Sequence, residues 1–463
     1  MFALLVCKEM KTNMQMFWKI AYRLGLVVIA IQTLLGLGWI LENILVLPDF
    51  AETKVLLNMS QTGVIDEYGG PLYVAVISTF RWLENLVGIP FQIPIYLLQL
   101  MLAAYSVFAF ARECGANWEK AKWMPYMVSA YVNSIPFLLQ AHFAVLPYSA
   151  SGSIFLLLLT ELMTLCRGAK TRAVEQKDFL KKAVRVVLLW ALSSLILPEY
   201  HWLSGLLVLF GLIYIGLCLP KLRGWCVLTV ALGVLCSGFL LVAFTQEGSR
   251  GRMQNTLEAQ AARRLAWPDI LRMYSFWEPE IIESFTIDEM AQISMVPERM
   301  EDLFGPRIEQ IYGKEKANEI YKDMAVTALL VNTKEVLGQV LCDFGSYLCP
   351  PVAITLEGKG VGGTYTGHHY EKLQSQNVGL TNLYVEWSQT SFGVLMLLML
   401  LNLPWYVKNH KTFLSWGGVA LLMQVLYYTW TTGGMVSYLK NPVAFVFWGT
   451  LAVLWLLRER KEE

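Results

Sequence analysis

The chain is dominated by about ten apolar stretches, separated by short loops and by a polar segment of about 140 residues. Hydrophobic residues make up 56% of the chain and charged residues 16%, against roughly 45–50% and 25% in ordinary soluble domains. A helix of roughly 20 apolar residues crosses the hydrocarbon core of a bilayer. The pattern therefore predicts an all-α integral membrane protein of about ten transmembrane helices with one large, mainly helical extracytoplasmic loop domain.

The apolar stretches define the predicted domain organisation. The predicted spans are residues 20–46, 91–111, 124–147, 152–166, 186–199, 203–219, 225–245, 388–405, 413–431 and 441–457. Residues 1–245 form an amino-terminal seven-span membrane module with an amphipathic first outer loop (47–90), residues 246–387 the extracytoplasmic loop domain, and residues 388–463 a carboxy-terminal three-span segment. The loop domain is mildly acidic, with about 20 acidic against about 13 basic residues.

Basic residues fix the predicted orientation. The short loops on one side hold most of the lysines and arginines, whereas those on the other side hold only Lys54, Arg81 and Lys440. Cytoplasmic loops carry the excess of basic residues, so both termini are expected in the cytoplasm and residues 246–387 outside. A net charge of +1 gives no reason to expect nucleic acid as a partner. We expect a bacterial plasma membrane.

Four carboxylates follow the first predicted span: Asp49, Glu52, Asp66 and Glu67. A carboxylate at the boundary between water and lipid acts as a general base when partial burial raises its pKa towards neutrality. It can also bind a divalent cation. The alternative is an ordinary polar loop in which an acid favours a helix amino terminus.

Several other polar residues lie in or beside predicted spans. An ionisable group inside a span, such as Glu161, is costly, and it either serves function or bonds to a neighbouring helix. Glu199 and His201 either line a site or mark the water boundary. For His142, at the outer end of a span, a structural hydrogen-bonding role is expected. Cys342 and Cys349 in the loop domain form either a disulfide or two buried thiols.

The order of these features resembles a known family. An acidic loop after span one leads to a Gly-Pro-Leu-Tyr turn (70–73), followed by a glutamine-containing second span, LLQLMLAAYSVFAFARE, a third span that breaks at a proline and a fourth with a buried glutamate. Together they resemble the amino-terminal module of GT-C membrane glycosyltransferases, especially those related to protein mannosyltransferases and aminoarabinose transferases. The resemblance covers seven spans and continues into LLVNTKEVLGQVLCDFGSYL of the loop domain.

The resemblance implies a glycosyltransferase that moves a sugar from a polyprenyl-phosphate donor to a glycan, lipid or protein acceptor outside the membrane. The family usually has adjacent acidic residues soon after span one, whereas here Asp49 and Glu52 are separated and the adjacent pair comes later. Asp49 is the expected base, with Glu52 as the second catalytic carboxylate. The residues expected to bind substrate or its phosphate are Arg81, Asp66, Glu67, Glu199, His201, Arg263 and Arg264. No cofactor is implied with certainty; a divalent cation is the candidate.

Other classes of function compete with this interpretation. An O-antigen ligase or polymerase also carries a large outer loop, although usually one rich in arginine and histidine. A transporter or flippase of lipid-linked substrates usually shows two similar halves, whereas this chain has seven predicted spans before the loop domain and three after it. A non-catalytic scaffold would use the loop domain to bind a partner.

Overall fold

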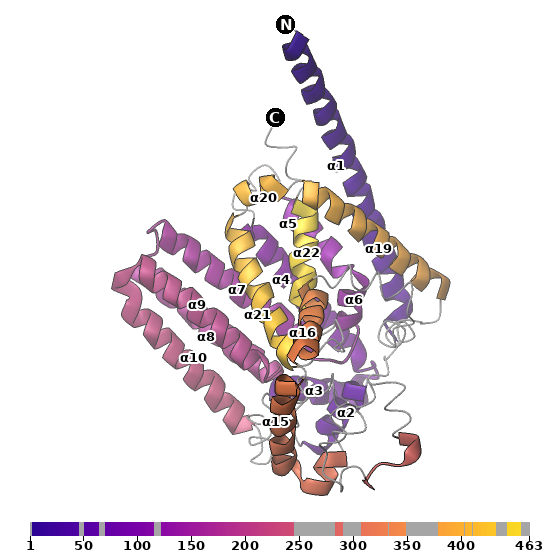
Figure 1. Cartoon of the computed structure of the whole chain (residues 1–463), viewed down its shortest axis with the longest axis vertical. Helices are drawn as coiled ribbons and strands as arrows, with labels where there is room; N and C mark the ends of the chain where they lie inside the picture. Colours follow the sequence, from indigo (N-terminus) through magenta and orange to yellow (C-terminus); the bar gives the residue numbers. More distant parts are fainter. Residues whose placement is uncertain are drawn as a thin grey trace. The chain divides into compact units, whose positions relative to one another are not determined.

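The computed structural model describes residues 2–45, 51–63, 70–114, 122–244, 283–289, 307–331, 333–348, 378–401, 403–409, 411–431 and 442–454, and every regular element within these ranges is a helix (Figure 1). The helices are α1 (Phe2–Asn43), α2 (Ala51–Thr62), α3 (Pro71–Val87), α4 (Gln92–Cys114), α5 (Met124–Asn133), α6 (Pro136–His142), α7 (Tyr148–Lys170), α8 (Gln176–Ile196), α9 (Tyr200–Cys218), the short 3-10 helix η2 (Pro220–Leu222), α10 (Arg223–Phe244), α15 (Lys314–Val331), α16 (Thr333–Leu348), α19 (Val378–Leu401), α20 (Leu403–Asn409), α21 (Lys411–Thr431) and α22 (Pro442–Leu454).

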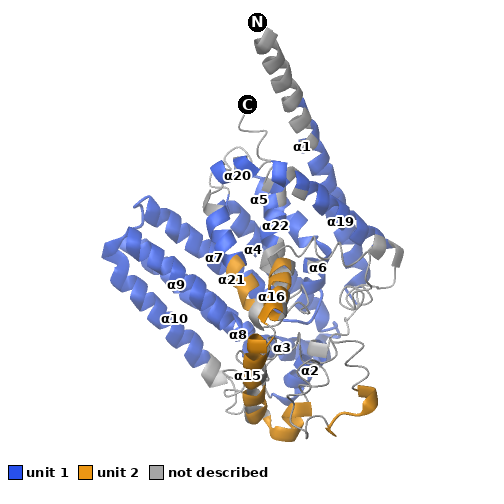
Figure 2. Ribbon diagram, in the orientation of Figure 1, with its two compact units in different colours: residues 1–245, 350–421, 438–463 blue, residues 246–349, 422–437 orange. Residues whose placement is uncertain are grey.

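The chain divides into two compact units (Figure 2). Unit 1 comprises residues 1–245, 350–421 and 438–463, and unit 2 comprises residues 246–349 and 422–437. Most of the predicted carboxy-terminal segment thus shares a unit with the predicted amino-terminal module.

Six described helices are long and apolar enough to cross a membrane. They are Tyr22–Asn43, Gln92–Cys114, Tyr148–Lys170, Tyr200–Cys218, Pro220–Leu240 and Leu383–Leu401. Large apolar side chains on these helices point away from the protein: Leu41 is 79% exposed and Phe239 72% exposed. Apolar surface of this extent suits lipid and not water. The fold is therefore helical and membrane-integral in character.

The other four predicted spans differ from a single long apolar helix. The third is split into α5 and α6, and α8 carries charged residues through its first half. The apolar part of α21 is the shorter helix Leu414–Tyr427, and the described part of α22 has 13 residues. The total of ten spans remains a prediction.

The helix break between α5 and α6 lies at Pro136, which has no backbone N–H to donate. The break exposes the carbonyl of Ser134. This carbonyl accepts a hydrogen bond from the Gln32 side chain of α1, at 2.7 Å, and another from the Tyr384 hydroxyl of α19. Inside a membrane a freed carbonyl needs such partners, because water is absent. Helices distant in sequence thus stabilise the break.

Helix α7 is the most buried of the six apolar helices: 83% of its most apolar 18-residue stretch lies inside the protein. It packs against α4, α8 and α9, and α8, α9 and α10 lie side by side (Figure 1). Small buried residues fill its first turns, Ser149 to Ser153. Small side chains let neighbouring membrane helices approach closely.

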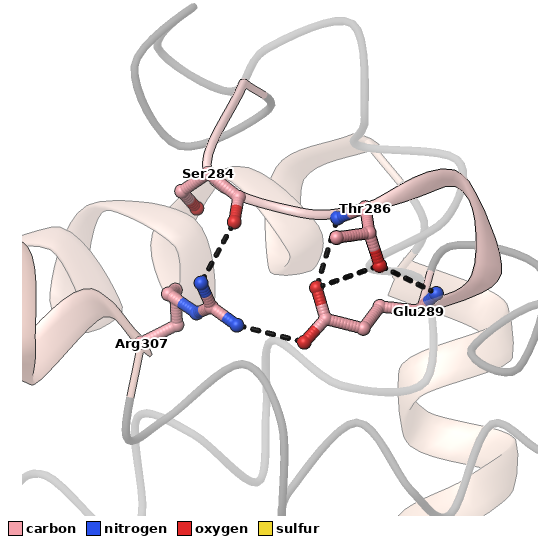
Figure 3. A network of polar contacts seen from close by, with 4 residues as sticks. All are labelled: Ser284, Thr286, Glu289 and Arg307. Atoms are coloured by element: carbon pink, nitrogen blue, oxygen red, sulfur yellow. Dashed lines mark hydrogen bonds and ion pairs between the residues drawn. The ribbon is translucent and has the colours of Figure 1, made fainter.

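Unit 2 contains a polar cluster that holds its first described turn (Figure 3). The Arg307 guanidinium donates to a Glu289 carboxylate oxygen at 2.7 Å and to the Ser284 carbonyl at 2.9 Å. The Thr286 N–H donates to Glu289 at 2.8 Å, and the Glu289 N–H donates back to the Thr286 hydroxyl at 3.2 Å. This reciprocal pair is a capping box, which satisfies two otherwise free N–H groups at a helix start.

Helices α15 (Lys314–Val331) and α16 (Thr333–Leu348) belong to unit 2 and follow each other directly in the sequence. Their segments Ala325–Val331 and Val336–Cys342 together are apolar enough for a membrane span but are bent by 106°. Cys342 is exposed, so the alternative of a buried thiol is wrong for this residue, and Cys349, its candidate disulfide partner, lies outside the described residues.

Candidate functional site

Several expected site residues lie outside the described ranges: Asp49, Asp66, Glu67, Arg263 and Arg264. Glu52 belongs to the first turn of α2, directly after the undescribed residues 46–50. The structure also describes Arg81, Glu199 and His201. The candidate site is therefore built from the surroundings of α2, which continues the segment that carries Asp49.

The start of α2 is anchored on a buried turn. Thr53, next to Glu52, donates its hydroxyl to the Val145 carbonyl at 3.2 Å. Leu56 and Met59, one and two turns further on, are also buried. Residues 143–147 connect α6 to α7, so the carboxylate-bearing end of α2 lies against this connection.

Gln99 of α4 organises the polar groups under that turn. Its side-chain amide donates to the His142 carbonyl at 3.0 Å and to the Ala144 carbonyl at 2.9 Å. Its amide oxygen accepts from the Tyr73 hydroxyl of α3 at 3.2 Å. Burial raises the pKa of Tyr73 well above its usual value, so the phenol keeps its proton and remains a donor. The glutamine noted in the second span thus joins α3 and α4 to the turn.

His142 is a structural hydrogen bonder, as the sequence predicts. Its Nδ1 lies 2.7 Å from the Ser149 hydroxyl and its Nε2 lies 3.1 Å from Asn133 Oδ1. Both ring nitrogens are therefore occupied, and the ring is buried. We refer to Gln99, Tyr73, His142, Asn133 and Ser149 together as the outer polar network, after the side of the membrane on which the sequence predicts these residues to lie.

The beginning of α3 docks on the end of α8. The Gly70 N–H donates to the Ile196 carbonyl at 3.0 Å. A Cβ atom on Gly70 would lie only 2.0 Å from the Leu195 carbonyl oxygen, so no side chain fits at this position. This explains the glycine of the Gly-Pro-Leu-Tyr turn, and it places α3 beside the α8–α9 connection, which contains Glu199 and leads into the first turn of α9 with His201.

His201 lies in the first turn of α9, between two tryptophans. Its ring centroid is 5.9 Å from that of Trp190 and 5.1 Å from that of Trp202. The Trp190 indole N–H donates to the His201 carbonyl at 2.9 Å. Among the described residues, no group bonds to the buried Nδ1 of His201.

Arg81 clamps α2 to α3. Its guanidinium donates to the Leu57 carbonyl at 3.3 Å and to the Ser60 hydroxyl at 3.1 Å, near the carboxy-terminal end of α2. It also lies 6.0 Å from the centre of the Phe91 ring. A cation suits this end of a helix, because the free carbonyls there carry partial negative charge. The sequence gives no sign of this intramolecular role.

An apolar groove of about 580 Å³ runs between α1, α4 and α5. Leu37, Ile40 and Leu100 line it together with aromatic side chains at one end. Asn133, a member of the outer polar network, also lines it. The groove and the network thus share one residue, Asn133.

Glu161 is not an isolated charge within its helix. It accepts from Arg185 of α8 at 3.3 Å. Helix α7 extends four residues beyond the predicted span at each end, so Glu161 keeps its predicted place near the middle of the helix. Within the described residues, no group of three His, Cys, Asp or Glu side chains is arranged to hold a metal ion.

Comparison with family models, curated proteins and solved structures finds no match to this chain. The fold itself indicates an integral membrane protein of helical class, with a buried polar network, an apolar groove and a helix, α2, that has Glu52 in its first turn.

Proposed function

We propose that this chain is a membrane glycosyltransferase that moves a sugar from a polyprenyl-phosphate donor to a glycan, lipid or protein acceptor. In this proposal the outer polar network faces the outside of a bacterial plasma membrane, and both termini are cytoplasmic. The proposal rests on the expected family resemblance and on one structural observation. The carboxylate-bearing start of α2 is anchored at Val145, beside a network that shares Asn133 with an apolar groove.

The groove fits the donor's tail. An isoprenoid chain is apolar and needs a dry surface of side chains such as Leu37, Ile40 and Leu100. A volume of about 580 Å³ is within the range of roughly 300–1,000 Å³ that small-molecule sites occupy. The phosphate and sugar would then lie at the polar end of the groove.

The chemistry assigns each group a role. Asp49, assisted by Glu52, takes the proton of the acceptor hydroxyl while that oxygen attacks the anomeric carbon. The bond between the anomeric carbon and the phosphate oxygen breaks, and its electron pair leaves with the phosphate. Cationic or hydrogen-bonding groups stabilise this leaving charge, and the candidates are His201, Arg263 and Arg264. Because Arg81 already binds α2, its contribution is to position the carboxylate-bearing helix.

The test is a transfer assay on the full chain in nanodiscs, with a panel of polyprenyl-phosphate sugars and detection of released polyprenyl phosphate. Loss of the base in Asp49→Asn lowers turnover by about 100-fold or more. Glu84→Gln, in the same outer loop, is the matched control and keeps wild-type turnover. Full activity in Asp49→Asn overturns the assignment of the base, and no release of polyprenyl phosphate from any donor overturns the proposed function.

A transporter or flippase of lipid-linked substrates is the second candidate, and one observation favours it. Tyr105, Phe108 and Tyr126 line both the apolar groove and a second, cationic cavity towards the other end of α4. Two cavities that share a wall suit a substrate that passes between them. Movement of a labelled polyprenyl-phosphate sugar across proteoliposomes, without product formation, distinguishes this candidate from the transferase.

A further inference from the structure

A cavity of about 1290 Å³ lies between the carboxy-terminal part of α4, the start of α5, the part of α7 from Leu157 to Arg167 and the part of α8 from Lys182 to Leu192. Five cationic side chains line it, against two carboxylates. The cations are Arg112, Lys122, Arg167, Lys182 and Arg185, and the carboxylates are Glu113 and Glu161. The lining therefore carries an excess of three positive charges.

Each carboxylate of the cavity already has its own arginine. Arg167 lies 2.9 Å from Glu113, and Arg185 lies 3.3 Å from Glu161. Within the described part of the chain, no carboxylate forms an ion pair with the remaining three cations. These three are Arg112 of α4, Lys122, which lies two residues before α5, and Lys182 of α8. Three positive charges from separate segments thus converge on one cavity.

The rest of the lining is mostly apolar, apart from Thr160 and Thr164 and the hydroxyls of two tyrosines. Leu157 of α7 and Leu188, Leu189 and Leu192 of α8 line the cavity away from the charged helix ends. Leu188 is 56% exposed and Leu192 39% exposed, so this wall is open at the side of the bundle. A ligand with a negatively charged head and a hydrocarbon tail matches both parts.

We propose that this cavity binds an anionic phospholipid from the surrounding leaflet, with its phosphate among Arg112, Lys122 and Lys182 and its acyl chains along the leucine wall. The volume exceeds the roughly 300–1,000 Å³ of small-molecule pockets, so it holds a headgroup together with the first part of its chains. Basic pockets between membrane helices bind anionic headgroups in this way.

The proposal does not depend on glycosyl transfer. The orientation given under the proposed function places this cavity in the cytoplasmic leaflet. Only this choice of leaflet rests on the proposed function. The charge and the apolar wall define the ligand whichever way the bundle is inserted.

Native mass spectrometry of the full chain in detergent tests the site. Phosphatidylglycerol and phosphatidylcholine with identical acyl chains are added separately, and glycerol phosphate and inorganic phosphate serve as tail-free probes. We expect bound phosphatidylglycerol at concentrations where phosphatidylcholine and both tail-free anions give no adduct. The combined variant Arg112→Gln, Lys122→Gln and Lys182→Gln should lower phosphatidylglycerol binding by roughly 10-fold or more.

The matched control changes the same number of charges on neighbouring helix ends. Lys170, Lys177 and Lys181 are exposed and do not line the cavity. Their combined replacement by glutamine should leave binding unchanged.

Equal losses in both triple variants, or equal binding of the two phospholipids, overturn the site. Tail-free phosphate binding as tightly as phosphatidylglycerol overturns the lipid assignment. The single variant Lys122→Gln, at an exposed position, should reproduce part of the loss if the triple variant does not fold.

Discussion

The side-chain amide of Gln32 in α1 lies 2.7 Å from the carbonyl oxygen of Ser134, where the chain breaks between α5 and α6. The same amide nitrogen lies 2.6 Å from the Ser388 hydroxyl of α19. One buried glutamine therefore connects the first apolar helix to a helix break and to a helix from the far end of the sequence.

Replacing this amide should destabilise the bundle. Gln32→Leu removes both hydrogen bonds from a buried site, and we expect a loss of about 1 kcal/mol in the free energy of unfolding, in line with interhelical hydrogen bonds in membranes. The measurement is denaturant unfolding in detergent. Gln92→Leu is the control, because the Gln92 amide lies at 3.5 Å from its acceptor on an exposed part of the fold. Equal stability of the two variants would contradict the role of Gln32.

A methyl group at Gly70 should separate α3 from α8. The new Cβ of Gly70→Ala would meet the Leu195 carbonyl at 2.0 Å, so the backbone must move and the Gly70 to Ile196 hydrogen bond is lost. Overpacking of this kind costs about 1–3 kcal/mol. Thermal unfolding in detergent measures the effect. Gly238→Ala, in α10, meets no atom within 4 Å and should be neutral or slightly stabilising.

Arg81→Lys should loosen α2 although it keeps the positive charge. One guanidinium nitrogen, Nη1, donates to both the Leu57 carbonyl and the Ser60 hydroxyl. The shorter lysine side chain places its ammonium short of this position and lacks the planar guanidinium geometry. Loss of one bond made by a charged donor costs about 1.5–3 kcal/mol. Hydrogen exchange of the α2 amides should accelerate in this variant and stay at the wild-type rate in Glu84→Gln. Unchanged exchange in Arg81→Lys would show that the clamp does not hold α2.

Acid should weaken the first described turn of unit 2. The Thr286 backbone N–H, together with the Thr286 hydroxyl and the Arg307 guanidinium, holds the pKa of Glu289 below its ordinary value. A folded pKa below the unfolded one means that the ionised carboxylate stabilises the fold. This contribution is complete above the unfolded value of about 4.3 and disappears as the pH falls through the folded pKa.

Hydrogen exchange of residues 283–289 between pH 7 and pH 3, corrected for the intrinsic pH dependence of exchange, measures this loss. Glu289→Gln should expose the turn already at pH 7 and abolish most of the acid-dependent change. Asp288→Asn, at the exposed neighbouring position, should keep the wild-type profile. The same pH profile in Glu289→Gln and the wild type would exclude Glu289 as the source.

Apolar length was sufficient to predict the long helices, because a bilayer-spanning segment is recognisable from local composition alone. The partners of the helix break were not predictable, since Gln32 and Tyr384 lie 102 and 250 residues from Ser134. The anchoring of α2 on Val145 likewise depends on a contact over 92 residues. Of the expected site, Asp49 and four others lie outside the described residues, so their roles stay predictions.

The cationic cavity shows a different limit of sequence reasoning. Arg112, Lys122, Arg167 and Lys182 are among the lysines and arginines in or next to the short loops of one side, and the sequence predicts from them only the side of the membrane. Their convergence on one cavity depends on how α4, α5, α7 and α8 pack. Local composition contains no information on this packing.

The break at Ser134 also has a consequence for biogenesis. The ribosome synthesises α5 and α6 long before Tyr384 and Ser388 exist, so the interrupted span enters the bilayer with part of its hydrogen bonding unmet. A nascent chain that stops after residue 245 would lack these partners altogether. The hydrogen bonding at the helix break is therefore complete only after α19 has been synthesised.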